Sequence, residues 1–138
     1  MDIPAETLLD SIDRLREQDS HFSREAYLFV VAALGVAVSR LPLSRRADPN
    51  RRHLHGREVI AGAIELAVAE FGPLAPGVFT EWGLVRGRDV GEIVFQLVDA
   101  GQLSTQPDDC IEDFDVPQDL VAALSLPHDA GRRSRDRV

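Results

Sequence analysis

The ten residues Val94-Phe95-Gln96-Leu97-Val98-Asp99-Ala100-Gly101-Gln102-Leu103 decide the predicted fold. Val94, Leu97 and Val98 recur at helical spacing, and Gly101 readily adopts the left-handed conformation that ends a helix. The chain then passes directly from the helix into a segment whose composition indicates a β-strand. This order is typical of the third helix of a winged-helix domain, which runs into its wing.

The flanking sequence predicts further helices on both sides of this stretch. Apolar residues recur every three or four positions, and Ser23 and Asp89 are suitable helix N-caps. Pro42, Gly72 and Gly83 are suitable helix ends. The predicted helices are Ala5–Arg16, a second helix from Ser23 to Pro42, Arg57–Phe71, Ala75–Trp82, a fifth helix from Asp89 to Gly101, and Gln118–Leu124.

Two short segments on either side of Pro107-Asp108-Asp109 are predicted to form a β-hairpin, namely Gln102–Gln106 and Cys110–Phe114. The predicted fold is therefore mainly α with a small β-hairpin. A winged-helix-like second half, residues 57–115, is expected to pack on the two N-terminal helices within one domain of residues 1–126. The Arg-rich tail, residues 127–138, lacks apolar periodicity and is predicted to be disordered.

Composition narrows the class of protein. The chain has 138 residues, a net charge of -8, one cysteine and 44% hydrophobic residues, which is typical of one globular domain. The N-terminal sequence, Met1 to Glu6, lacks the basic and apolar regions of a signal peptide, and the longest apolar run, Ala26 to Val38, is short for a membrane span. A cytoplasmic protein without a membrane segment is expected, and the sequence suggests no cofactor.

The polar positions of the predicted recognition helix are mostly acidic. They are Asp89, Glu92, Gln96 and Asp99, and the predicted wing adds Asp108, Asp109, Glu112 and Asp113. Because carboxylates repel a phosphate backbone, this surface argues against sequence-specific DNA binding. A winged helix used for contact with another protein fits the charges better, with Asp108, Asp109, Glu112 and Asp113 as the candidate protein-contact face.

One basic stretch stands out in this acidic chain. Between Arg40 and Arg57 there are six arginines and one acid, Asp48, and the stretch is predicted to contain a loop from Leu43 to Gly56. One interpretation is a phosphate contact, as in an RNA- or ribosome-associated protein, or a docking site for an acidic partner. The alternative is a solvated loop that pairs with the acidic wing of the same chain. The candidate anion or nucleic-acid contacts are Arg45, Arg46, Arg51, Arg52 and His53.

Signals of catalysis are weak. His53, His55 and Glu58 lack a clear further metal ligand, and acids around Cys110 are expected to raise the pKa of its thiol. Tyr27 and Trp82 are interpreted as core or boundary aromatics. The sequence therefore favours a non-enzymatic protein–protein interaction or regulatory module, with the RNA-binding hypothesis as the alternative.

Several short strings resemble a bacterial family without an established function. They are Glu25-Ala26-Tyr27-x-Phe29-Val30, Arg52-His53-x-x-Gly56-x-Glu58, Phe71-Gly72, Trp82-Gly83, Asp89 to Phe95, and Glu112-Asp113-Phe114. The family is named the Minf family, after a locus tag of a methanotrophic verrucomicrobium, and the resemblance covers Leu8 to Leu120. It implies a compact bacterial cytoplasmic domain and no catalytic residues. His55 departs from the family pattern, in which a small hydroxyl residue precedes the glycine.

Overall fold

Helices make up most of the computed structural model, which describes residues 7–48, 53–107, 109–117 and 119–125. The α-helices are α1 (Leu8–Gln18), α2 (Arg24–Ser39), α3 (Leu43–Arg46), α4 (Gly56–Phe71), α5 (Ala75–Trp82), α6 (Gly87–Asp99) and α7 (Leu120–Ser125). Two 3₁₀ helices, η2 (Gly72–Leu74) and η3 (Ile111–Phe114), lie between them. The mainly helical class predicted from the sequence is confirmed.

Caps and glycines set the ends of these helices. The Ser23 Oγ accepts a hydrogen bond from the Ala26 N–H at 3.2 Å, as the sequence predicts. Thr7 caps α1 in the same way, so this helix begins later than predicted. Gly83 ends α5 with φ 86°, in the left-handed region that favours glycine.

The hydrophobic core lies between α2 and α4, which pack together along their lengths. Tyr27 and Val30 of α2 are fully buried, as are Ala63 and Ala67 of α4. Small alanines let the two helices approach closely. Rings from α2, α4 and α5 close one end of this interface: Phe29 lies 5.2 Å from Phe79 and 5.5 Å from Trp82, measured between ring centroids. The interpretation of Tyr27 and Trp82 as core or boundary aromatics is confirmed.

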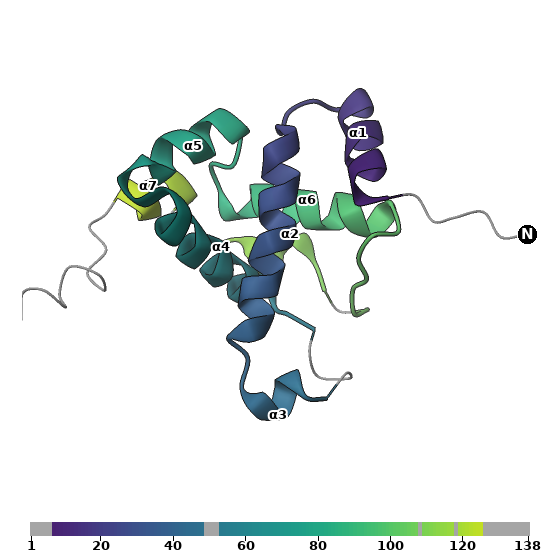
Figure 1. Ribbon diagram of the computed structural model, residues 1–138. Helices are drawn as coiled ribbons and strands as arrows, with labels where there is room; N and C mark the ends of the chain where they lie inside the picture. Colours follow the sequence, from purple (N-terminus) through teal and green to yellow (C-terminus); the bar gives the residue numbers. More distant parts are fainter. Residues whose placement is uncertain (1–6, 49–52, 108, 118, 126–138) are drawn as a thin grey trace, which may run out of the picture.

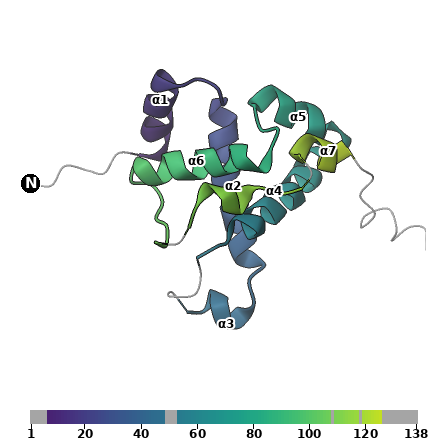
Figure 2. The same ribbon diagram turned by 180° about the vertical axis from the view of Figure 1, so that it is seen from behind.

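The remaining helices surround the α2–α4 pair (Figure 1). α6 lies across α2, and the reverse view in Figure 2 shows the same crossing from behind. α1 packs on α2 and α6, whereas α5 and α7 pack on each other at the opposite end. α3 projects from the end of α2, away from the other helices.

One apolar stretch, Gly56–Trp82, is long enough and apolar enough by composition to cross a membrane. The chain does not continue through it as one regular helix, because Gly72 has φ 52° and Gly72–Leu74 forms η2. Val59, Ile60, Ala75 and Phe79 from its two halves are buried in the core. Its apolar character is therefore used in packing α4 and α5 against α2.

The predicted β-hairpin is wrong. No strand occurs in the described residues, and the segment predicted as its second strand is mostly the 3₁₀ helix η3. Local bonds from carboxylates explain the difference, because Asp109 Oδ2 accepts from the Gln106 N–H at 2.7 Å and Asp113 Oδ2 from the Cys110 N–H at 3.1 Å. Short acidic side chains thus satisfy the backbone that a hairpin would have paired across strands. Without a wing, the winged-helix interpretation is not supported.

Three smaller predictions also need correction. α6 begins at Gly87, two residues before the predicted cap, and Asp89 instead accepts from the Val85 and Arg86 N–H groups at 2.9 and 2.8 Å. The predicted loop from Leu43 to Gly56 begins with the short helix α3, which follows Pro42 because proline is favoured at a helix start. The final helix begins at Leu120, and the predicted disordered tail lies outside the described residues.

Candidate binding groove

Three glycines position η3 against the starts of α4 and α6. A Cβ at Gly56 would collide with the Asp113 carbonyl, and a Cβ at Gly87 with the Phe114 carbonyl. A Cβ at Gly91 would lie 2.8 Å from the Phe114 ring. Because these residues lack side chains, the backbone of η3 sits directly on both helices, with Phe114 inserted between them and 5% exposed.

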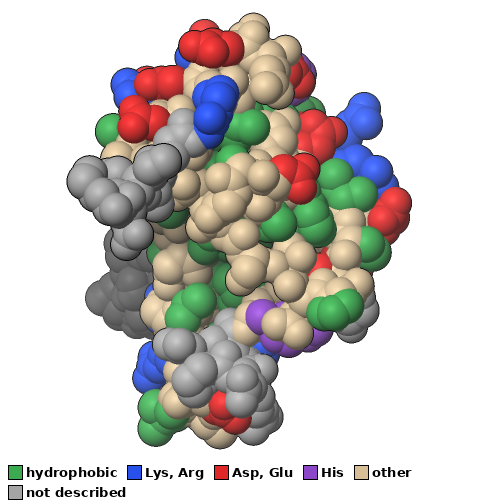
Figure 3. Space-filling view, turned by 90° about the vertical axis from the view of Figure 1, so that its right-hand side faces the viewer, with side chains coloured by type: hydrophobic (Ala, Val, Ile, Leu, Met, Phe, Trp, Pro, Cys, Tyr) green, Lys and Arg blue, Asp and Glu red, His purple; other side chains and the backbone are tan. Residues whose placement is uncertain are grey.

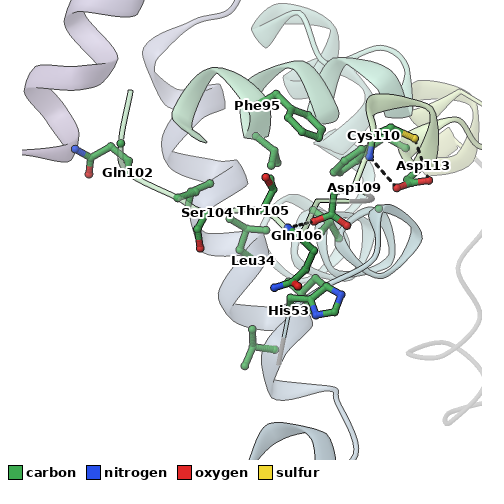
Figure 4. A pocket seen from close by; sticks show the side chains of 18 residues that line it. Leu34, His53, Phe95, Gln102, Ser104, Thr105, Gln106, Asp109, Cys110 and Asp113 are labelled. Atoms are coloured by element: carbon green, nitrogen blue, oxygen red, sulfur yellow. Dashed lines mark hydrogen bonds between the residues drawn. The ribbon is translucent and has the colours of Figure 1, made fainter. Parts of the chain in front are cut away.

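The position of η3 leaves a groove of about 660 Å³ between α2, the start of α4, α6 and the chain from Gly101 to Phe114. Its apolar side chains come from several elements: Leu34 and Val38 from α2, Val59 from α4, Val94 and Phe95 from α6, and Leu54, Leu103 and Phe114 from the connections. Figure 4 shows Leu34 in the middle, Phe95 above it, Gln106 beside it and His53 below. This volume is in the range of cavities that bind ligands.

One side of the groove is formed by Leu103, Ser104 and Thr105, whose backbone does not pair with any described residue. Within the described part of the chain, these three residues make no hydrogen bond through backbone or side chain. Their neighbours are anchored: the Gln102 N–H donates to the Leu97 carbonyl at 2.8 Å and its side chain to Ser11 Oγ at 3.1 Å. At the other end, Gln106 is held in the turn with Asp109.

The part of the groove beyond Gln106 carries Asp109, Cys110 and Asp113, which Figure 4 shows together. Cys110 Sγ lies 3.5 Å from Asp113 Oδ1. The pKa of the Cys110 thiol is raised, mainly by desolvation and to a smaller extent by hydrogen bonds with Asp113 and Glu112. A thiol with a raised pKa is a poor nucleophile at neutral pH, so this side of the groove offers anionic hydrogen-bond acceptors.

Acidic groups dominate the charge on this face of the molecule. Residues 99–115 contain six carboxylates and no arginine. Figure 3 shows hydrophobic side chains flanked by acidic ones over the middle of the face, with histidine below them. At the far end of η3, Arg88 binds Asp115 at 2.9 Å and lies 3.7 Å from Glu112, and its guanidinium holds the pKa of Asp115 below its usual range. Asp109 and Asp113 form no ion pair of this kind with the described residues.

His53 borders the lower part of the groove. Its Nδ1 is buried and has no hydrogen-bond partner among the described residues, whereas its carbonyl accepts from Arg45 Nη2 at 2.9 Å. The ring lies 5.6 Å from that of His55, which is the N-cap residue of α4. In the described chain, no group of three or more His, Cys, Asp or Glu residues is arranged to hold a metal ion.

Three arginines of the basic stretch, Arg40, Arg45 and Arg46, bind other parts of the same chain. Arg45 Nη1 donates to Glu58 Oε2 at 2.7 Å, and Arg46 Nη1 donates to the Ser39 carbonyl at 3.1 Å. Arg40 pairs with Glu65. The sequence predicts that this stretch pairs with the acidic segment, but the described residues pair differently. Two of the arginines bind Glu58 and Glu65 of α4, and the acidic segment binds Arg88.

The structure thus separates the predicted site residues. Asp109 and Asp113 line the groove, Glu112 lies beside it, and Asp108 is outside the described residues. Of the predicted anion contacts, Arg45 and Arg46 are on α3, Arg51 and Arg52 are outside the described residues, and His53 belongs to the groove. Most of the other groove residues were not predicted as site residues, because long-range packing brings them together and no local motif marks them. They include Leu34, Phe95, Leu103, Ser104, Thr105 and Gln106.

Comparison with known proteins adds no relative: no protein-family model, no curated protein and no solved structure matches this chain. The resemblance to the Minf family therefore stays a prediction.

Proposed function

We propose that this protein is a non-enzymatic protein–protein interaction module whose groove holds an exposed segment of its partner. The single observation that carries the proposal is the groove itself, with an apolar floor, an acidic side and an edge whose backbone does not pair with the described residues. Peptide-binding modules combine these features, because main-chain hydrogen bonds give affinity and side-chain pockets give specificity.

The unpaired edge favours a polypeptide over a small molecule as the ligand. Leu103, Ser104 and Thr105 offer backbone donors and acceptors that alternate between the two edges of the segment, and Ser104 and Thr105 are exposed. A second chain can bind such a row repeatedly along its length, whereas a small ligand uses a few points. The candidate protein-contact residue Asp109 lies at the Gln106 end of this edge, and Asp113 lies beyond it, next to Cys110.

The pairing of the arginines weakens the RNA-binding alternative. A phosphate contact requires a guanidinium that can exchange its present partner for phosphate. Arg45 already makes bonds to both oxygens of Glu58 and one to the His53 carbonyl. These bonds join the basic stretch to the start of α4, so the charge of Arg45 stabilises the fold.

A matched pair of substitutions on α2 tests the proposal. Leu34→Glu places a carboxylate on the apolar floor of the groove, and Leu28→Glu makes the same change at a side chain of the same helix that is 38% exposed and outside the groove. Tagged forms of both variants and of the native protein are used to capture proteins from a native lysate, and the partners are quantified by mass spectrometry. We expect Leu34→Glu to reduce recovery of the main partner by about tenfold, as for loss of a central interface residue, and Leu28→Glu to leave it unchanged.

Leu34 also packs against the core, so Leu34→Glu could reduce capture by destabilising the fold. A second pair of substitutions, at exposed positions, distinguishes this effect from loss of the contact. Thr105→Trp fills the mouth of the groove from an exposed position, and Thr80→Trp adds the same bulk to an exposed position on α5. Circular dichroism confirms that each variant is folded. Equal recovery of the partner with all four variants would show that the groove is not the contact, and the proposal would be wrong.

A further inference from the structure

We infer that the segment held in the groove is an extended, basic and apolar stretch of a partner protein, which pairs as a β-strand with Leu103, Ser104 and Thr105. This inference rests on the proposed function, and it specifies the conformation and the chemistry of the partner segment. It also gives a reason for the sequence pattern that predicts a strand at Gln102–Gln106, where the chain itself supplies no partner strand among the described residues.

The backbone N–H and C=O groups along this edge can pair with a second strand without breaking a hydrogen bond between described residues. Leu103, Ser104 and Thr105 have no hydrogen bonds to other described residues that would have to break. Gln102 is tied to α6 and α1, and Gln106 is tied to Asp109, so both ends of the segment are already placed. A segment fixed at both ends loses little conformational freedom when a second strand binds, which favours addition of that strand.

The side chains around the edge define the chemistry of the partner. In a β-strand, alternate side chains face opposite ways, so one set faces the apolar floor formed by Leu34, Val38 and Phe95. The rim is acidic, and the carboxylates of Asp109 and Asp113 each keep acceptor capacity beyond the backbone N–H that they bind. Apolar residues alternating with arginine or lysine complement both surfaces.

The probe is a blocked hexapeptide in which arginine and valine alternate, titrated into the full chain and followed by fluorescence anisotropy. A glutamate–valine peptide of the same length keeps the valines and reverses the charge. Two N-methylated forms of the arginine–valine peptide complete the set, one methylated at the valine amides and the other at the arginine amides. The two amide sets point to opposite edges of a strand, so only one set can pair with the protein.

We expect the arginine–valine peptide to bind and the glutamate–valine peptide to fail. One N-methylated form should bind at least about tenfold more weakly than the other, as the loss of paired backbone hydrogen bonds predicts. In the bound protein, hydrogen exchange should slow at alternate amides, either Ser104 alone or Leu103 and Thr105 together. Equal binding of the two charge types, equal binding of the two methylated forms, or no protection at these amides would overturn the inference.

Charge variants of the protein test the acidic rim. Asp109→Asn with Asp113→Asn keeps an oxygen acceptor for the Gln106 and Cys110 N–H groups but removes two charges. Peptide binding should weaken by about fivefold, as expected of two exposed ion pairs. The control, Glu70→Gln with Glu81→Gln, makes the same change in net charge at exposed positions of α4 and α5 outside the groove and should leave binding unchanged. Equal weakening by both double variants would show that net charge alone attracts the peptide, and would overturn the inference.

The two proposals fail in different ways. If no peptide binds but Leu34→Glu still reduces capture of the natural partner, the strand-pairing inference is wrong and the interaction module remains. If Leu34→Glu and Leu28→Glu capture the partner equally, the proposed function itself is wrong.

Discussion

At the scale of single residues, Glu58 joins the basic stretch to the core. It is the third residue of α4, where its Oε1 accepts from the His55 N–H at 2.9 Å, and it also binds the Arg45 guanidinium. Burial raises the pKa of Glu58, but the bonds from Arg45 and His55 outweigh it, so the pKa lies below its ordinary value. The carboxylate form is therefore favoured in the folded protein.

We expect Glu58→Gln to lower stability at neutral pH by about 1 kcal/mol, because glutamine keeps an oxygen acceptor for the His55 N–H but removes the charge that pairs with Arg45. Because the folded pKa is lowered, the contribution of Glu58 is present above the unfolded pKa of about 4.3 and is lost as pH falls through the folded pKa. The difference between native and variant proteins should thus narrow as pH falls from about 5 to about 3. Urea denaturation at a series of pH values measures this, and a difference that is constant with pH would contradict the role given to Glu58.

Tyr27 is the second residue with a distinct electrostatic role. Its hydroxyl donates to Gln96 Oε1 at 2.5 Å and links α2 to α6, and the residue is fully buried. The pKa of Tyr27 is raised, mainly by burial and to a smaller extent by the negative charge of Asp19.

Because Tyr27 is the one tyrosine in the chain, tyrosinate absorbance reports on it directly. A raised folded pKa means that the stability contribution is present below about pH 10 and is lost as pH rises further. We expect tyrosinate to form above this pH and together with the loss of helical circular dichroism. Tyr27→Phe should lower stability at neutral pH by about 1 kcal/mol, because Gln96 loses its partner. Titration near pH 10 without unfolding would contradict this account.

At the scale of elements, η3 is held by glycines at the starts of two helices. Gly56 and Gly87 allow backbone-to-backbone contact with η3, whereas a Cβ added at Gly35, in the middle of α2, would have no neighbour within 4 Å among the described residues. Glycine is thus used for close approach at the helix starts and has no such use in α2.

This difference predicts opposite effects of the same substitution. Gly87→Ala should destabilise the fold by about 2 kcal/mol, because its Cβ meets the rigid Phe114 carbonyl. Gly35→Ala should stabilise the fold by about 0.5 to 1 kcal/mol, because alanine favours the helix and meets no described neighbour. Chemical denaturation of both variants measures the two values. Equal effects would show that η3 does not sit on the start of α6.

The elements also show which features the sequence can predict. Caps and stops act within a few residues, so Ser23, Gly72 and Gly83 correctly indicate ends of helices. The hairpin prediction fails because Asp109 and Asp113 also act locally. Their carboxylates bind nearby backbone N–H groups, and these bonds replace the cross-strand pairing that the apolar pattern indicates.

At the scale of the whole molecule, the groove depends on contacts between residues far apart in the sequence. Leu34, Phe95 and Leu103 come from three parts of the chain, and no spacing or motif places them together. The acidic half of the site was predictable from composition, because Asp109 and Asp113 stand in a run of acids. The apolar floor was not, because each of its residues is indistinguishable in sequence from an ordinary core residue.

The distribution of charge over the molecule gives a prediction about nucleic acid. Because Arg40, Arg45 and Arg46 of the basic stretch bind groups of the chain itself, nuclease treatment of the lysate should leave recovery of the partner unchanged. Mass spectrometry and quantification of co-purifying RNA measure this. Loss of the partner after nuclease treatment, together with its loss in Arg45→Ala and Arg46→Ala, would favour RNA binding by the basic stretch.

The most direct test of the groove as the contact is site-specific crosslinking in the native lysate. A photoreactive benzophenone amino acid is placed at position 104, on the edge of the groove, or at position 43, where Leu43 of α3 is 68% exposed. The groove account predicts that the main partner crosslinks from position 104 and not from position 43, and that the crosslinked peptide is basic and apolar. Crosslinking of the same partner from position 43 and not from position 104 would place the contact on the basic stretch and contradict the account.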